Sequence, residues 1–141
     1  VDVGYGQLAW SLRTDRRVTV IERTNVRTMD PALITEPVDL ITIDASFISL
    51  KIVVPSILRF LKPRGCILAL IKPQFEAGRG RVGKGGVVKD PRLRREIIDN
   101  LCQFFSGRSL SCGPVISSPI RGPKGNQEFI IMLRPGSDSG L

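Results

Sequence analysis

Short, largely apolar runs of residues recur along the chain at the length of β-strands. They cover residues 18–21, 40–43, 66–71 and 129–133, and residues 110–117 are a further candidate. In the four runs the apolar positions do not alternate with polar ones, as they do in a strand that is half exposed. We therefore expect both faces of these strands to be covered.

Two segments between these runs have apolar residues at helical spacing. The first carries Pro55 near its predicted start, and residues 63–65, Pro-Arg-Gly, are its predicted stop. Its apolar positions are Val54, Ile57, Leu58 and Leu61. A weaker helix is expected over residues 7–13.

The second helix has clearer ends. Asp90 is a natural N-cap, Pro91 occupies the first helical position, and Gly107 follows the predicted end. One face of this helix is apolar and consists of Leu93, Ile97, Ile98, Leu101 and Phe104. The ends of this element are therefore predicted from local signals alone.

Strands alternating with helices indicate an α/β domain with a mostly parallel sheet. Only a turn-rich segment, residues 118–126, precedes the last strand, so that strand is expected to be antiparallel. Residues 1–4 read as the end of an earlier strand, which predicts that the first strand of the sheet is missing. Ligands bind such sheets outside the carboxyl ends of the strands. The residues at three of these ends are Glu22, Asp44 and Lys72.

Composition narrows the class of protein. A chain of 141 residues is expected to form one domain, here over residues 1–135, with a disordered tail at 136–141. The net charge of +8 favours a polyanionic partner such as nucleic acid. Histidine is absent, which excludes every imidazole mechanism. Three cysteines without metal or disulfide spacing indicate a reducing, cytoplasmic setting, and no run is long enough to span a membrane.

The glycine-rich segment 78–86 matches GxGxxG and most of a Walker A motif, but both matches are weak. Gly85 stands where a magnesium-binding hydroxyl is needed, and no helix is predicted to start there. The segment is predicted instead to be a mobile, basic arm that follows a phosphate backbone, with a plain solvated loop as the alternative. Its cations, together with the lysine that follows it, are Arg79, Arg81, Lys84 and Lys89.

Three charged residues stand beside predicted strands and are candidates for catalysis. Asp44 and Lys72 each follow a buried run, and Glu128 precedes the last strand. A helix-capping role for Asp44 and an edge-strand charge at Glu128 are the alternatives. Core packing is predicted for the remaining notable side chains, which are Trp10, Phe60, Phe104, Phe105, Cys66, Cys102 and Cys112.

Six sequence blocks stand in order along the chain, at residues 1–10, 22–27, 44–50, 71–76, 82–88 and 122–128. Together they resemble the TlyA (haemolysin A) family, which consists of bacterial ribosomal RNA 2′-O-methyltransferases with an FtsJ-like, S-adenosylmethionine-dependent domain. The resemblance extends to about Pro135 and implies a Rossmann-like methyltransferase sheet.

The resemblance also implies roles for individual residues. FtsJ-like enzymes are described as using a Lys-Asp-Lys-Glu tetrad, in which Asp44, Lys72 and Glu128 take the last three places. The first lysine, the glycine-rich cofactor turn and an S4-like RNA-binding domain would lie before Val1. Cofactor contacts are implied for Asp2, at the ribose, and for Asn25 and Val26, at the adenine.

A lysine is a base only when its pKa falls well below about 10.4. Lys72 is predicted to be the general base, and Asp44 and Glu128 are predicted to orient it. The reaction requires no metal, because the sulfonium is already an activated leaving group. Three alternatives stay open. The chain could be a catalytically incomplete, basic RNA-binding fragment, a haemolysin, or a nucleotide hydrolase built on the glycine-rich segment.

Overall fold

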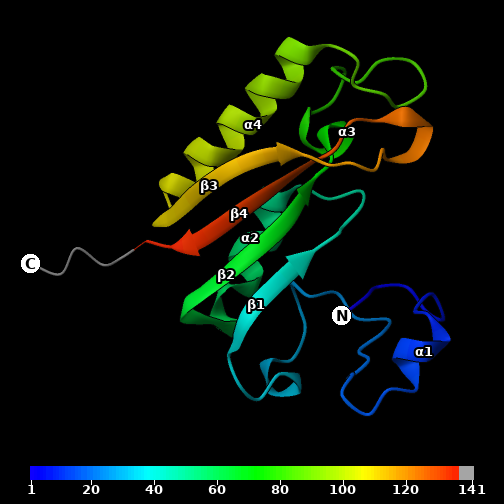
Figure 1. The fold of residues 1–141 in the computed structure, drawn as a ribbon, viewed down its shortest axis with the longest axis vertical. Coiled ribbons are helices and arrows are strands. Elements are labelled where there is room, and N and C mark those ends of the chain that lie inside the picture. The colour runs from blue at the N-terminus through cyan, green and yellow to red at the C-terminus, as the bar shows by residue number, and fades with distance from the viewer. Residues whose placement is uncertain (137–141) are drawn as a thin grey trace, which may run out of the picture. The chain divides into compact units, whose positions relative to one another are not determined.

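The computed structural model describes residues 1–136 (Figure 1). The chain consists of two compact units. The first unit is Val1–Glu36 and the second begins at Pro37. The predicted disordered tail lies outside the described residues except for Gly136, whose backbone N–H donates to the Ser109 carbonyl at 2.6 Å. The assignment of residues 1–135 to one domain stays a prediction.

The first unit contains little regular structure. Its only α-helix among the described residues is α1, Trp10–Arg13, so the helix predicted over residues 7–13 forms only in its second half. A short 3₁₀ turn, Pro31–Leu33, starts at Asp30, whose side chain accepts from Ala32 N. Trp10 is 75% exposed, and its predicted place in the core is wrong.

The predicted strand over residues 18–21 is also wrong. The segment 21–24 makes three backbone hydrogen bonds with residues 2–4 and nothing extends this pairing into a ladder. Apolar residues without a continuous partner strand do not form a strand, because each buried N–H and C=O needs its own partner.

The second unit is built on a four-stranded sheet. The strands are β1 (Val38–Ile43), β2 (Leu61–Ile71), β3 (Leu110–Ser117) and β4 (Phe129–Pro135), in the order β1-β2-β4-β3. β1 pairs with β2 in parallel, and β4 is antiparallel to both β2 and β3. Three strands therefore run in one direction and the last runs against them, which confirms the predicted α/β sheet.

Two helices pack on one face of this sheet. They are α2 (Leu50–Ile57) and α4 (Pro91–Ser106) (Figure 1). The ammonium of Lys51 on α2 lies 5.4 Å from the centre of the Phe104 ring on α4. The core between helices and sheet holds fully buried residues from every layer. They include Val54, Ile67, Leu101, Phe105, Ile131 and Leu133.

The ends of α4 are those that its local signals predict. The Asp90 side chain accepts from Arg92 N at 2.8 Å, Pro91 is the first helical residue, and Gly107 is the C-cap.

The helix α2 differs from its prediction. Ser49 caps α2, Pro55 lies near its end, and the chain passes through a 3₁₀ turn, Leu58–Phe60, into β2. A proline inside a helix removes a backbone hydrogen bond, so an early end is expected.

Residues 63–65 belong to β2 and do not form a stop after the helix. The register between β1 and β2 shifts at this point, and a Cβ on Gly65 would lie 2.9 Å from the Asp39 carbonyl oxygen. Proline and glycine are tolerated in strands where such an irregularity interrupts the ladder.

The expectation that both strand faces are covered is wrong. Leu40, Leu68 and Ile116 point away from the helix-covered face and are exposed, Ile116 by 57%. The cysteines are half-buried, not buried, and Phe104 is half-buried against Arg108. Phe60 and Phe105 are buried, as predicted.

Candidate active site

An ion pair joins the carboxyl ends of β1 and β2. Asp44 directly follows β1 and Lys72 directly follows β2, and because these strands are parallel, both residues lie at one edge of the sheet. Lys72 Nζ lies 2.6 Å from Asp44 Oδ1 and donates to Ser46 Oγ at 3.1 Å. The Lys72 side chain is 11% exposed and that of Asp44 is 73% exposed. The lysine stem is thus buried while its amine is held by two oxygens.

Glu128 reaches the same edge from the antiparallel strand. Phe129 pairs with Ile71, so Glu128 comes directly before this pair and Lys72 directly after it. Glu128 is buried and its Oε1 has no hydrogen-bond partner among the described residues. A Cβ on Gly122 would lie 2.1 Å from this oxygen, so the glycine leaves the space that the carboxylate occupies. Within residues 1–136 no ion pair joins Glu128 to Lys72.

A hollow of about 440 Å³ opens beside Lys72, which we call the lysine pocket. Its walls come from the segments after β1 and β2, from the glycine-rich segment and from the turn before β4. They include Ser46, Phe47, Gln74, Phe75, Lys124 and Asn126. Gln74 Oε1 is buried without a hydrogen-bond partner among the described residues. This volume is in the range of sites for small molecules.

Phe47 presents an aromatic ring at the rim of the lysine pocket. It is 89% exposed and its φ is 63°, a conformation that a bulky side chain rarely adopts. Its ring packs against Phe75 with 4.9 Å between centroids. The sequence analysis did not identify Phe47, although an aromatic residue three positions after a polar strand end is the signal that could have found it.

The glycine-rich segment is held in place at two points. Asn126 is buried and binds both the Val88 N–H, at 3.1 Å, and the Gly86 carbonyl, at 2.9 Å. Arg81 forms a two-pronged pair with Glu96 of α4, which raises the pKa of Arg81 and lowers that of Glu96. These contacts fix two points of the segment in the structure, and its role as a mobile, basic arm stays a prediction.

The other three predicted RNA-binding cations of this region are exposed. They are Arg79, Lys84 and Lys89, and no ion pair involves them within residues 1–136. Arg81, by contrast, already has an intramolecular partner. The basic surface of the segment thus depends on three of the four predicted residues.

Glu76 connects the segment after β2 to α2. It lies in the short helix α3, Pro73–Glu76, and accepts from Ser49 Oγ at 2.6 Å and from Leu50 N at 2.8 Å. Burial raises the pKa of Glu76, and these two hydrogen bonds only partly oppose the effect. Lys72 occupies the N-cap position of α3, and the two hydrogen bonds of Glu76 therefore fix the turn that follows it.

The predicted cofactor residues lie in the first unit. Asp2 N donates to the Ile21 carbonyl at 2.9 Å, and Thr24 N donates to the Asp2 carbonyl at 3.0 Å, so Asp2 lies beside the segment that carries Asn25 and Val26. The exposed carboxylate of Asp2 accepts from Gly4 N at 2.8 Å.

Glu22, the remaining residue predicted at a strand end, makes its contacts inside the first unit. It pairs with Arg13 and accepts from Gly6 N at 3.2 Å. Its carboxylate therefore has a structural role there.

Comparison with known proteins identifies the family of this chain. Residues 1–135 match the family described as FtsJ-like methyltransferase. The chain belongs to this family. This match confirms the family resemblance found in the sequence and the predicted methyltransferase fold.

Individual relatives of this FtsJ-like chain carry two kinds of name. It is 46% identical over 140 residues to 16S/23S rRNA (cytidine-2′-O)-methyltransferase TlyA of Mycobacterium tuberculosis, covering 99% of this chain and 52% of that protein. It is 38% identical over 135 residues to Hemolysin A of Brachyspira hyodysenteriae, covering 92% of this chain and 55% of that protein. The chain spans about half the length of the curated relatives it matches.

A solved structure shares the fold closely. A protein of Lactococcus lactis, provisionally named a hemolysin, superposes on the FtsJ-like chain with a TM-score of 0.88 at 40% identity, over 94% of this chain and 64% of that one. Among residues 1–136 no helix is long and apolar enough to cross a membrane. In the same residues no cluster of three or more His, Cys, Asp or Glu side chains could hold a metal.

Family membership implies a methyl donor, and the first unit offers groups that fit one. An exposed carboxylate fixed by a backbone N–H, as in Asp2, is suited to accept hydrogen bonds from the two hydroxyls of a ribose. Asn25 is exposed and its Oδ1 accepts from Arg27 N at 3.0 Å, which leaves its amide nitrogen as a donor for a base edge.

Proposed function

We propose that the chain transfers the methyl group of S-adenosylmethionine to the 2′-hydroxyl of a ribose in ribosomal RNA. The observation that carries this proposal is the contact of 2.6 Å between the largely buried Lys72 and Asp44, at the ends of two parallel strands. Membership of the FtsJ-like family and the name of the M. tuberculosis relative support the reaction class.

Lys72 is the proposed general base, which acts as the neutral amine and accepts the proton of the 2′-hydroxyl on Nζ while the methyl group passes from sulfur to oxygen. A ribose hydroxyl is a poor nucleophile at neutral pH, so its proton has to leave as the new bond to carbon forms. In the structure Lys72 Nζ contacts both Asp44 and Ser46, so the 2′-hydroxyl would replace one of these two oxygens. Asp44 then keeps the amine aimed at the hydroxyl, and Glu128 supports it from the adjoining strand. General base assistance of this kind is worth about 10²–10⁴-fold.

The first unit supplies the proposed cofactor contacts. When bound, S-adenosylmethionine supplies a methyl group on a positively charged sulfur that is ready to leave. We assign its ribose to Asp2 and its adenine edge to Asn25 and Val26. The proposal requires no metal, because the leaving group is already activated.

Ribosomal RNA is the proposed partner, in the cytoplasm. The net charge of +8 and the exposed cations Arg79, Lys84 and Lys89 support a polyanionic substrate. Arg81 would contribute only if RNA replaced Glu96 as its partner.

The test compares two lysines, Lys62 inside β2 and Lys72 directly after it. Transfer of tritium from methyl-labelled S-adenosylmethionine to ribosomal RNA is measured for the parent chain, Lys72→Ala and Lys62→Ala. Resistance of the labelled linkage to alkaline hydrolysis reports methylation at the 2′-oxygen. We expect Lys72→Ala to lose about 10²–10⁴-fold in rate and Lys62→Ala to keep the parental rate. A folded Lys72→Ala chain with the parental rate contradicts the assignment.

A catalytically incomplete, basic RNA-binding module is the alternative function. It predicts that the parent chain binds RNA but transfers no methyl group and gives no heat with S-adenosylmethionine in titration calorimetry. Binding of the cofactor together with 2′-O-labelled product excludes it.

A further inference from the structure

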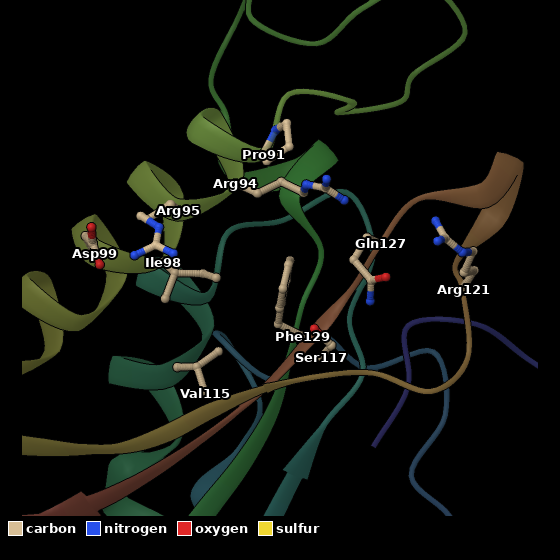
Figure 2. A pocket seen from close by; sticks show the side chains of 10 residues that line it. All are labelled: Pro91, Arg94, Arg95, Ile98, Asp99, Val115, Ser117, Arg121, Gln127 and Phe129. Atoms are coloured by element: carbon tan, nitrogen blue, oxygen red, sulfur yellow. The ribbon is translucent and has the colours of Figure 1, made fainter.

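A second hollow, of about 540 Å³, lies between α4 and the adjoining ends of β3 and β4 (Figure 2). We call it the arginine pocket, after Arg94 and Arg95 of α4 and Arg121 of the turn before β4. Neighbouring residues of that turn separate it from the lysine pocket, since Asn126 lines the lysine pocket and Gln127 lines the arginine pocket. The proposed catalytic roles use none of its residues.

The charge of the arginine pocket is strongly positive. Three guanidinium groups line it against one carboxylate, Asp99. Elsewhere Arg13, Arg17 and Arg81 pair with carboxylates. By contrast, within residues 1–136 no ion pair involves an arginine of this pocket, and Arg121 donates only to the Gly125 carbonyl, at 3.2 Å. Unpaired guanidinium groups around one hollow favour an anionic ligand, and their planar fork matches a phosphate.

The floor of the pocket has a different chemistry. It is formed by apolar side chains, those of Ile98, Val115 and Phe129. Figure 2 shows Arg94 reaching from α4 toward the side of the pocket where Gln127 and Arg121 lie, above this floor. Phosphate-binding groups above an aromatic and aliphatic surface fit a nucleotide, whose base has an apolar face and whose backbone is charged.

Gln127 adds a fixed polar group. Its Nε2 donates to the carbonyls of Glu128, at 2.8 Å, and Ser118, at 3.3 Å, so the amide cannot turn freely. This orientation leaves Oε1 as a possible acceptor for an amino group of a base. A nucleotide would use the arginines, the ring of Phe129 and this acceptor together.

We propose that the arginine pocket binds a nucleotide of the RNA substrate that flanks the one held at Lys72. Arg94 and Arg121 hold its phosphate, Phe129 packs against its base, and Arg95 adds positive charge on the opposite side of the pocket. The identity of the ligand as RNA rests on the proposed function. The turn before β4 lines both pockets, with Asn126 in the lysine pocket and Gln127 in the arginine pocket, so the two pockets are neighbours.

The test is a pair of matched double variants. Arg94→Gln/Arg121→Gln removes two charges from the pocket, and Arg64→Gln/Arg134→Gln removes two exposed charges from the opposite end of the sheet. Affinity for a short, fluorescein-labelled single-stranded RNA is measured by anisotropy over a range of salt. We expect the pocket variant to bind at least about tenfold more weakly. Its salt slope should fall by about 0.7 for each lost phosphate contact, while the control stays close to the parent.

Three results would overturn the proposal. They are equal losses in the two double variants, a labelled oligoglutamate peptide that binds the parent chain more tightly than the RNA does, and a parent chain that does not bind RNA. Thermal unfolding followed by circular dichroism checks the fold, and Arg94→Lys/Arg121→Lys, which keeps the charge, should recover part of the affinity.

The same variants separate this proposal from the proposed function. Loss of RNA affinity in Arg94→Gln/Arg121→Gln with unchanged methylation by Lys72→Ala contradicts only the catalytic role of Lys72. Parental RNA affinity in the pocket variant with loss of methylation in Lys72→Ala contradicts only the arginine pocket.

Discussion

The strands β1 and β2 carry a lysine–aspartate pair at each end, and the two pairs differ in their surroundings. At the start of the strands Lys62 Nζ contacts both oxygens of Asp39, at 2.9 and 3.0 Å. At the other end Lys72 contacts Asp44 at 2.6 Å. The Lys62 side chain is 46% exposed, whereas that of Lys72 is 11% exposed. The same two residue types on the same strands thus form one pair in which both side chains are exposed and one in which the lysine is largely buried.

An ion pair by itself therefore does not mark a functional site. An exposed pair contributes about 0–1 kcal/mol to stability and leaves both groups hydrated. At the Lys72 end the sheet brings together a carboxylate oxygen of Glu128 and an amide oxygen of Gln74, neither of which has a hydrogen-bond partner within residues 1–136, and the exposed ring of Phe47. The convergence of these groups, more than the ion pair, distinguishes this end of the sheet.

The largest expected difference between the two ends comes from their aspartates. Asp44→Asn keeps an oxygen beside Lys72 but removes the charge that orients the amine, and we expect about a hundredfold slower methyl transfer, the size of effect that misplacement of a reacting group produces. Asp39→Asn should leave the rate unchanged. The labelled-methyl assay on ribosomal RNA measures both, and equal rates in the two variants contradict the comparison.

The next largest effect is expected at Asn126. Asn126→Ala removes three hydrogen bonds of a buried side chain and leaves the Val88 N–H without its partner, which should lower the free energy of unfolding by about 2 kcal/mol. Urea unfolding measures this. Asn100→Ala, at an exposed position of α4, is the control and should be neutral or slightly stabilising. Parental stability of Asn126→Ala would show that the glycine-rich segment needs no tether.

Phe47 tests the same end of the sheet through binding. Phe47→Ala should leave stability unchanged, because the ring is 89% exposed, but weaken RNA binding about tenfold through loss of stacking on a base. Leu40→Ala removes an exposed apolar side chain of β1 outside the lysine pocket and is the control. Anisotropy titration decides between them, and equal affinities for the two variants rule out a stacking role.

The smallest expected effect concerns pH. Because burial raises the folded-state pKa of Glu76, its contribution to stability is fully present below the ordinary value of 4.5 and is lost as pH rises through the folded value. Glu76→Gln cannot ionise, so its stability relative to the parent should increase over that range. Denaturant unfolding at several pH values measures the difference.

Ser49→Ala provides the matched change for this pH effect. It removes a hydrogen bond that lowers the pKa of Glu76, so it should steepen the loss of stability with pH. Parallel pH curves for the parent, Ser49→Ala and Glu76→Gln would show that Glu76 does not control this dependence.

Local signals in the sequence were sufficient for some elements and insufficient for others. Asp90, Pro91 and Gly107 predict the ends of α4 correctly because capping acts within one turn of helix. Residues 18–21 and Trp10 were misassigned because strand pairing and burial depend on distant partners. For the site, the sequence places Asp44 and Lys72 at strand ends and Phe47 three positions after one of them, but it carries no sign that the ring of Phe47 is exposed or that an arginine pocket forms.

The amino-acid sequence by itself determined the kinds of element, the polar residues that terminate the strands and the family to which the chain belongs. The elements and strand ends follow from periodicity and capping, which act over a few residues, and the family follows from the resemblance of six blocks spread along the chain. Only the tertiary structure decided that Lys72 is buried while Lys62 is exposed, that Gly122 leaves space for Glu128, and that three arginines line one hollow. Such facts depend on which remote segments meet, because burial and charge pairing are properties of the packed chain.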